Sequence, residues 1–366
     1  MNTEGGPTRE RLEALIGDRI VAWARLEPWS VMRCQLEQAR TSVIVKWRRS
    51  GAVRSDPRQV LVEHAALTFL QDIGVASGPR LLASDLAAGV LILEDLAPRR
   101  PLDRQIREAG MGGAWPGLAA FAHATGELAA LTTGRGAAFE ACLIRSGVSP
   151  TDHRLAEAQA TLAMMRELED LGLPLGGLVE TDLETAFATL RAPGPFQAFS
   201  NGDCEANNFL SEGGEGRLID FEAADFRHAL VDAAAIHVPG PAWLTVAGPS
   251  QRAELEQIYR RALVAGVTAA DDDDVFGLGM AAACLTRACE RLSRFPRLDD
   301  RPSGDASRLQ MVSALEAAAE AASYHRRLPQ LVGWARQAAS WLRRRWPDAD
   351  QDLDQLAPYT PRATWA

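Results

Sequence analysis

The stretch that decides the fold runs from residue 201 to residue 222 and reads NGDCEANNFLSEGGEGRLIDFE. It places Asp203 five residues before Asn208, and a second aspartate, Asp220, follows within an apolar segment. The glycine-rich turn between them is flanked by apolar pairs, which predicts a β-hairpin. A hairpin centred on Gly214 would set Asn208 opposite Asp220, with their Cβ atoms roughly 4.5–5.5 Å apart.

These residue types suit phosphate chemistry. A hard cation such as Mg²⁺ takes oxygen ligands at about 2.0–2.1 Å, so one ion could touch both Asn208 and Asp220. Asp203, one loop-length upstream, can accept the proton of a hydroxyl beside that metal. An amide, a carboxylate and a base around one Mg²⁺ predict a phosphoryl-transfer site. Taken singly, each residue would also suit an ordinary turn, because Asp and Asn favour loops.

Upstream of this stretch the pattern is strand-like with one helix. The helix begins after Asp56-Pro57, shows apolar residues at helical spacing and ends at Gly74. Five short segments rich in apolar and β-branched residues predict strands, at Ile20–Leu26, Val31–Leu36, Thr41–Trp47, Arg80–Ala83 and Val90–Leu93. This order predicts a five-stranded, largely antiparallel sheet with one helix on it.

After Leu96 the composition changes to segments rich in Ala, Leu and Arg, which predict helices. They are Gly117–Thr132, Asp152–Leu171, Glu180–Leu190, Gln251–Ala265, Val275–Leu292, Leu309–Arg326 and Leu328–Arg345. The fold class is therefore predicted to be α+β and bilobal. A small N-terminal antiparallel β lobe with one helix spans residues 1–96, with a hinge near 93–96, and a large, mainly helical lobe spans residues 97–366.

Composition narrows the class of protein. The 366 residues are 47% hydrophobic and 24% charged, the balance of a globular protein with a substantial core. A net charge of −9 argues against nonspecific nucleic-acid binding. The five cysteines form no CxxC pair, which indicates a reducing cytoplasm without disulfides or zinc. No apolar signal segment or membrane span is present in the pattern, so a cytoplasmic protein without a membrane partner is predicted, and its oligomeric state is left open.

Two residue types are rare. Lys46 is the only lysine among 39 basic residues, and three of the four asparagines fall at positions 201, 207 and 208. Lysine provides a compact ammonium and arginine a wide planar fork, so a lysine kept against this habit marks a place where arginine cannot substitute. Chance survival of one lysine is the alternative.

The motifs resemble those of the aminoglycoside phosphotransferase and choline kinase-like family, small-molecule kinases with a protein-kinase-like fold. The N-G-D-x-x-x-x-N segment and the following I-D-F-E look like the family's catalytic and metal loops. Val43-Ile44-Val45-Lys46 is similar to its nucleotide-binding strand, and Leu91-Ile92-Leu93-Glu94-Asp95-Leu96 to the hinge that meets adenine. The segment that begins Val231-Asp232 is similar to the helix opening after the metal loop.

This resemblance implies a transfer of the γ-phosphoryl group of ATP or GTP, with Mg²⁺, to a hydroxyl of a small acceptor such as an aminoglycoside, another amino alcohol, a sugar or another antibiotic. Asp203 is the implied base, and Asn208 and Asp220 are the implied Mg²⁺ ligands. The implied nucleotide-binding residues are Lys46, Glu63, Ser30, Glu94 and Leu96. The implied loop supports are Asn201 and Asp232.

The sequence departs from the family pattern at three places. Asn201 stands where most members have histidine, and Glu205-Ala206-Asn207 replaces the usual H-P-G. No glycine occurs between Gly17 and Gly51, where a phosphate-covering loop belongs. The segment 27–32 must form that turn, and Ser30 is its predicted phosphate contact. These departures motivate the alternative hypothesis of a catalytically silent pseudokinase that binds a nucleotide or another ligand without transferring phosphate.

Overall fold

The computed structural model describes residues 6–26, 30–48, 56, 58–149 and 154–362. The chain forms two compact units. Unit 1 comprises Met1–Pro101, Arg135–Thr151 and Ser200–Asp225. Unit 2 comprises Leu102–Gly134, Asp152–Phe199 and Phe226–Ala366. A single boundary between residues 96 and 97 is the expectation from the sequence, whereas these units interleave along the chain.

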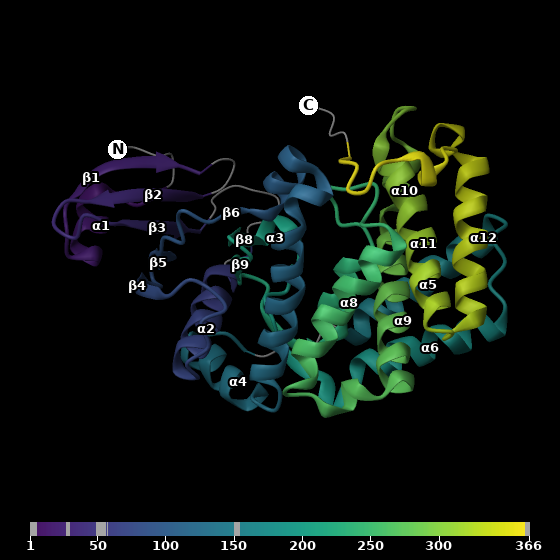
Figure 1. The fold of residues 1–366 in the computed structure, drawn as a ribbon, viewed down its shortest axis with the longest axis horizontal. Helices are drawn as coiled ribbons and strands as arrows, with labels where there is room; N and C mark the ends of the chain where they lie inside the picture. The colour runs from purple at the N-terminus through teal and green to yellow at the C-terminus, as the bar shows by residue number, and fades with distance from the viewer. Residues whose placement is uncertain (1–5, 27–29, 49–55, 57, 150–153, 363–366) are drawn as a thin grey trace. The chain divides into compact units, whose positions relative to one another are not determined.

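Unit 1 is built on a five-stranded antiparallel sheet (Figure 1). Its strands are β1 (Ile20–Arg25), β2 (Val31–Leu36), β3 (Ser42–Trp47), β4 (Leu81–Asp85) and β5 (Val90–Glu94). The strand order is β1-β2-β3-β5-β4, and every neighbouring pair is antiparallel. The predicted sheet is confirmed, with the strand ends within two residues of the expected ones.

The two faces of this sheet differ in burial. Side chains alternate along a strand, so Val43 and Val45 of β3 are buried while Lys46 lies on the opposite face. The buried face packs against Leu12 of α1 (Arg9–Ile16). The sequence pattern did not predict α1, because Leu12 is the one residue within this short helix that is buried.

Helix α2 (Arg58–Asp72) confirms the predicted helix of unit 1, although Pro57 lies outside the described residues. It packs against α4 (Gly136–Arg145), where the rings of Phe69 and Phe139 meet edge to face at 5.6 Å between centroids. This contact explains why residues near 140 belong to unit 1. Helix α4 was not among the predicted helices.

The predicted hairpin is present, but its predicted register is wrong by one residue. Strands β8 (Phe209–Glu212) and β9 (Glu215–Leu218) pair with Phe209 opposite Leu218, and β6 (Arg100–Pro101) lies beside β8. The connection is a two-residue turn at Gly213 and Gly214, whose φ angles are 59° and 87°. Such turns need positive φ at both central residues, so the symmetry axis falls between the two glycines and not on Gly214.

Unit 2 is mainly helical, as predicted, and each of the seven predicted segments overlaps a helix, although residues 152–153 of one segment lie outside the described residues. Its helices are α3 (Leu102–Thr132), α5 (Arg154–Asp170), α6 (Gly177–Arg191), α7 (Leu230–Ala233), α8 (Pro249–Val264), α9 (Asp273–Glu290), α10 (Phe295–Asp299), α11 (Ala306–Tyr324) and α12 (Pro329–Arg345). Short strands β7 (Gln197–Ser200) and β10 (Asp225–His228) pair with one another. Helix α3 starts earlier than predicted. Its first part was not predicted as helix because it contains Gly110, which has a non-helical conformation, and Pro116.

Single turns of 3-10 helix join these elements. They are η1 (Gly194–Phe196), η2 (Ala206–Asn208), η3 (Ala234–Ile236), η4 (Thr268–Asp271), η5 (Arg291–Arg294), η6 (Pro347–Ala349) and η7 (Leu353–Gln355). Within the described parts of the chain, no helix has the length and apolar character needed to cross a membrane.

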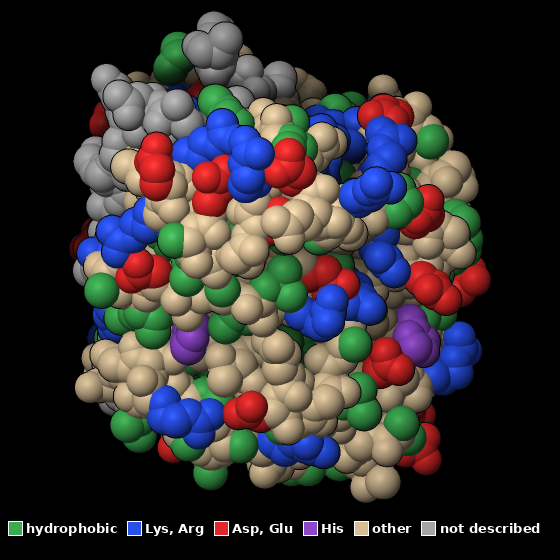
Figure 2. All heavy atoms as spheres, turned by 90° about the vertical axis from the view of Figure 1, so that its left-hand side faces the viewer, with side chains coloured by type: hydrophobic (Ala, Val, Ile, Leu, Met, Phe, Trp, Pro, Cys, Tyr) green, Lys and Arg blue, Asp and Glu red, His purple; other side chains and the backbone are tan. Residues whose placement is uncertain are grey.

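Charged side chains of both signs are interspersed on the face drawn in Figure 2. Ion pairs within unit 1 show the same mixing, for example Arg11 with Asp85 at 2.5 Å and Arg19 with Glu37 at 3.2 Å. Exposed pairs of this kind contribute little to stability, since solvent screens them.

A buried acid lies between two histidines in unit 2. Glu256 Oε2 is 2.7 Å from His237 Nε2 and 3.1 Å from His325 Nε2, and Glu256 is 6% exposed. Burial works to raise the pKa of Glu256, but hydrogen bonds and charge from the two histidines prevail and lower it to about 2. The ionised carboxylate therefore stabilises unit 2 above its ordinary pKa of 4.5, and this contribution is lost as the pH falls toward 2.

We predict that Glu256→Gln lowers the free energy of unfolding near neutral pH by on the order of 3 kcal/mol, the equivalent of this pKa shift. The deficit relative to the unaltered protein should shrink as the pH falls below about 4.5, because the carboxylate of the unfolded chain then gains a proton while the native carboxylate stays ionised until about pH 2. Urea unfolding of both proteins between about pH 6 and pH 3 measures the difference. Glu320→Gln, which removes a half-exposed partner of Arg252, is the control and should change stability by less than about 1 kcal/mol. A deficit that is the same at every pH would contradict this account.

Candidate active site

The only lysine of the chain lies in a cluster of acids in unit 1. Lys46 Nζ is 2.6 Å from Glu63 Oε2 and 3.2 Å from Glu222 Oε2, and it also contacts Asp220 Oδ1. The Lys46 side chain is 12% exposed and that of Glu63 is 2% exposed. The predicted pairing of Lys46 with Glu63 is thus present as a buried ion pair between β3 and α2.

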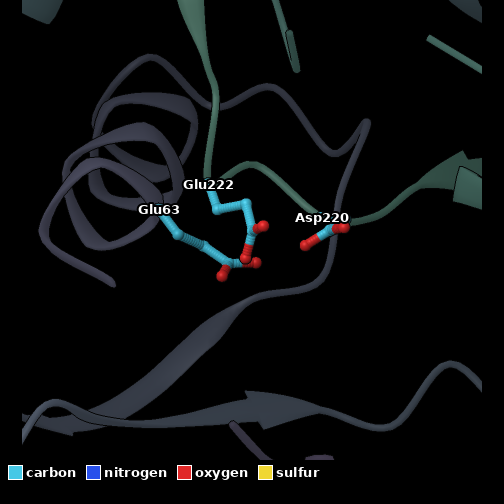
Figure 3. Close-up of side chains that lie close together, drawn as sticks. All are labelled: Glu63, Asp220 and Glu222. Atoms are coloured by element: carbon cyan, nitrogen blue, oxygen red, sulfur yellow. The ribbon is translucent and has the colours of Figure 1, made fainter. Parts of the chain in front are cut away.

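The three carboxylates come from two parts of unit 1 (Figure 3). Glu63 extends from α2, while Asp220 and Glu222 follow β9, and one oxygen from each lies within 4.8 Å of the others. Burial works to lower the pKa of Lys46, but the three neighbouring carboxylates prevail and raise it. The pKa of Glu63 is raised by burial and by the like charges beside it, against the pull of Lys46. One ammonium therefore faces three acids, and the cluster retains an excess of negative charge that favours a further cation.

Glu222 of this cluster and its neighbour Gln59 were not among the predicted site residues. Glu222 Oε1 accepts a hydrogen bond of 3.2 Å from Gln59 Nε2, so Glu222 links Lys46 to the first turn of α2. The signal was present in the sequence, since Gln59 and Glu63 are four residues apart on one helix face. Glu222 ends the quoted stretch two residues after Asp220, at a spacing that suits a shared face.

The backbone conformation after β9 places Asp220 and Glu222 beside Lys46. Asp220 has a φ of 62°, in the left-handed region that Asp and Asn enter more readily than other side chains. The next backbone N–H, of Phe221, donates to Glu63 Oε1 at 3.3 Å. The Phe221 ring is buried against Gly78, where an added Cβ would come within 2.7 Å of the ring.

Asn201 joins the predicted catalytic loop to the predicted metal segment. Its side chain is fully buried, and its Nδ2 donates to the backbone oxygens of Asp203 at 3.3 Å and Ile219 at 3.2 Å. An amide that bridges two backbone carbonyls fixes the distance between the two loops. Asn201 thus lies where a loop support is needed, although the histidine of the family pattern is absent.

The next residue, Gly202, permits the closest approach of these loops. Its φ is 86°, and a Cβ added there would lie 1.9 Å from the backbone oxygen of Ala223. No other residue type fits both the conformation and the space.

Asn208 holds Asp203. Asn208 is 4% exposed, and its Nδ2 donates to the Asp203 backbone oxygen at 2.9 Å and to Asp203 Oδ2 at 3.0 Å. Its Oδ1 accepts from Asn207 Nδ2 at 2.8 Å. Because the register is shifted, Asn208 is bonded across the hairpin to Ile219, whose N–H donates to the backbone oxygen of Asn208 at 2.9 Å. Asn208 is therefore paired with Ile219, the residue before Asp220, and not with Asp220 as predicted.

The remaining predicted residues lie apart from this cluster or at its edge. Ser30 lines the same small hollow as Lys46, Gln59 and Glu222, while the rest of its predicted turn, residues 27–29, lies outside the described residues. The Glu94 carboxylate accepts from the Arg80 N–H at 3.1 Å and is 3.6 Å from Arg217 Nη1. Leu96, two residues further along the chain, is buried.

Asp232 belongs to unit 2. It lies inside α7, whose N-cap is Ala229, so the helix begins before Asp232 and not at it. The turn is short, and Asp232 forms part of its helical hydrogen bonding, with its own N–H donating to the Ala229 oxygen at 3.2 Å.

We predict that Gly202→Ala disrupts the loop more than its positive φ alone would. Gly214 provides the matched control, because its φ is 87° and a Cβ there would meet nothing within 4 Å. Gly214→Ala should cost about 1–2 kcal/mol of unfolding free energy for the left-handed backbone. Gly202→Ala should cost about 1–3 kcal/mol more, because the added carbon overlaps the Ala223 carbonyl.

Thermal and urea unfolding of the two variants measure this difference. Equal destabilisation of the two would mean that the approach of Gly202 to Ala223 is looser than the structure has it.

No protein-family model and no curated protein sequence matches the chain. Among solved structures, the chain is similar to a choline kinase from Streptococcus pneumoniae, with 14% sequence identity, a TM-score of 0.48, and coverage of 85% of this chain and 97% of that one. A choline/ethanolamine kinase family protein from Mesorhizobium loti has 14% identity, a TM-score of 0.49, and coverage of 86% and 92%. A macrolide 2'-phosphotransferase from Brachybacterium faecium has 14% identity, a TM-score of 0.48, and coverage of 85% and 96%.

Proposed function

We propose that the protein is a small-molecule kinase, which moves the γ-phosphoryl group of ATP or GTP to a hydroxyl group of a small acceptor with the help of Mg²⁺. The observation that carries this proposal is the ion pair of Lys46 and Glu63 at 2.6 Å, buried beside Asp220 and Glu222. An ammonium held on the sheet by a helix glutamate, next to acids that suit a divalent cation, is the arrangement that phosphoryl transfer from a nucleotide requires.

In this proposal Lys46 binds the α- and β-phosphates of the nucleotide. Glu63 keeps the ammonium in place, since its own carboxylate is anchored by the Phe221 N–H. Ser30 lines the same small hollow as Lys46 and would contact a phosphate there. The backbone of Glu94 and Leu96 would receive the base.

The donor set suits Mg²⁺, which prefers carboxylate and amide oxygens. Asp220 would hold the ion with one carboxylate oxygen, and Asn208 with its amide oxygen, which the two Nδ2 hydrogen bonds to Asp203 orient. Bound there, Mg²⁺ would neutralise charge on the phosphate oxygens. The excess negative charge of the acid cluster supports this assignment.

Asp203 is the proposed general base. Oδ2 of its carboxylate accepts a hydrogen bond from Asn208 Nδ2 at 3.0 Å, which holds the carboxylate in place for proton transfer. As the acceptor hydroxyl loses its proton to Asp203, its oxygen forms a bond to the γ-phosphorus. The bond from that phosphorus to the β,γ-bridging oxygen breaks, and the nucleoside diphosphate leaves.

The experiment that tests the proposal is a measurement of ADP release from Mg-ATP across a panel of hydroxylated amines, sugars and antibiotics, with GTP run in parallel. Acceptor-dependent release supports the kinase. Nucleotide binding without release, across the whole panel, would favour the pseudokinase.

We predict that Asp203→Asn lowers turnover by roughly 10²–10⁴, the usual contribution of a positioned general base, and leaves nucleotide binding intact. Steady-state kinetics with the best acceptor of the panel measure the loss. Glu212→Gln, which removes an exposed carboxylate from the end of the same hairpin, is the control and should leave turnover unchanged. Full activity of Asp203→Asn would remove this residue from the mechanism.

We also predict that Lys46→Arg lowers turnover by about two orders of magnitude or more. Arginine keeps the charge, but its wider fork does not fit between Glu63 and the phosphates in a space that holds an ammonium at 2.6 Å. The matched control is Arg19→Lys, the reverse exchange at an exposed ion pair of the same unit. An active Lys46→Arg enzyme would show that the lysine serves only as a cation.

A further inference from the structure

A carboxylate that the proposed mechanism does not use lies in the middle of the predicted hinge. Asp95 follows Glu94 and precedes Leu96, and its side chain is 4% exposed. Asp95 Oδ2 accepts from Arg33 Nε at 2.6 Å and from Ser42 Oγ at 2.5 Å. Asp95 Oδ1 accepts from Arg33 Nη2 at 3.0 Å and from the Ala97 N–H at 3.1 Å.

The bond to Ala97 shapes the backbone around Leu96. A side-chain oxygen that accepts from the N–H two residues ahead closes an Asx turn, which restricts the backbone of the residue between them. That residue is Leu96, which is 4% exposed. Among the described residues, the Leu96 N–H has no hydrogen-bond acceptor. The turn thus holds a buried, unused donor in a set direction.

The bonds to Arg33 and Ser42 tie this turn to the sheet. Arg33 of β2 lies opposite Ile44 of β3, and Ser42, Ile44 and Lys46 share the face of β3 that points away from the core. Arg33 contacts Asp95 in a bidentate manner, with two nitrogens on two oxygens, which is the strongest geometry available to an arginine and a carboxylate. Burial works to raise the pKa of Asp95, but the hydrogen bonds from Arg33, Ser42 and Ala97 prevail and lower it, so the carboxylate stays charged.

We propose that Arg33, Asp95 and Ser42 form a positioning device for the purine base, which fixes the Leu96 N–H relative to Lys46. This inference rests on the proposed nucleotide-binding function of the same unit. The base accepts a hydrogen bond from the Leu96 N–H while Lys46 holds the phosphates, and the cluster sets the span between the two. The three side chains act through the hinge backbone and do not themselves touch the nucleotide.

The test compares a ligand that has the base with one that lacks it. ATP and inorganic tripolyphosphate, each with Mg²⁺, are titrated calorimetrically into the unaltered protein and into Asp95→Asn, Arg33→Lys and Ser42→Ala. In Asp95→Asn the affinity for ATP should fall about tenfold, the equivalent of one hydrogen bond, while the affinity for tripolyphosphate stays within about twofold. Arg33→Lys and Ser42→Ala, which keep part of the cluster, should show about threefold losses for ATP alone.

Glu37→Gln is the matched control, because it removes the acid of another arginine–carboxylate pair in this unit, exposed and away from the hinge. It should change neither affinity. Ser42→Ala keeps the test open if Asp95→Asn unfolds, since it removes a single contact. Equal losses for both ligands, or no loss for ATP, would overturn the inference while the kinase proposal stands. Failure of the unaltered protein to bind ATP would overturn both.

Discussion

The buried contact between the Lys46 ammonium and the Glu63 carboxylate is the constraint on which the rest of unit 1 depends. A buried ion pair is weak evidence for stability, because taking two charges out of water costs about as much as their attraction returns. The pair instead constrains the geometry of three segments of unit 1. Strand β3 must turn Lys46 away from the core, α2 must bring Glu63 to the same point, and the segment after β9 must deliver two further acids.

The segment from Ser200 to Asp225 meets these demands through its backbone more than through its side chains. Asn201 ties the two loops together by their carbonyls, and Gly202 allows them to touch. The Gly213-Gly214 turn then sets the register that leaves Asp220 one residue beyond the last hydrogen bond of Asn208. Main-chain contacts therefore determine where the carboxylates of Asp220 and Glu222 lie.

Much of this arrangement was predictable from the sequence, and the parts that were not have physical reasons. Strong period-2 and helical patterns marked the sheet, α2 and seven helices, and the rarity of lysine and asparagine pointed to the residues that meet in unit 1. The hairpin register could not be deduced, because three glycines allow several turns and only one closes with positive φ at both central residues. Asp95 was missed as a functional residue because its partner Arg33 is distant in the sequence and no local pattern reveals the pair. For Glu222 the spacing from Asp220 offered a local signal, but its contact with Lys46 is long-range and could not be read from the sequence.

The left-handed backbone at Asp220 means that two independent requirements select the same amino acid. A carboxylate is needed for charge, and glutamate would supply one, but a longer side chain without Asx-type local bonding enters that backbone region reluctantly. Asparagine and glycine would satisfy the backbone and lose the charge. Aspartate meets both requirements best, so glutamate at this position would keep the charge at the cost of a strained backbone. Shape and chemistry can be separated there by exchanging one oxygen for an amide nitrogen.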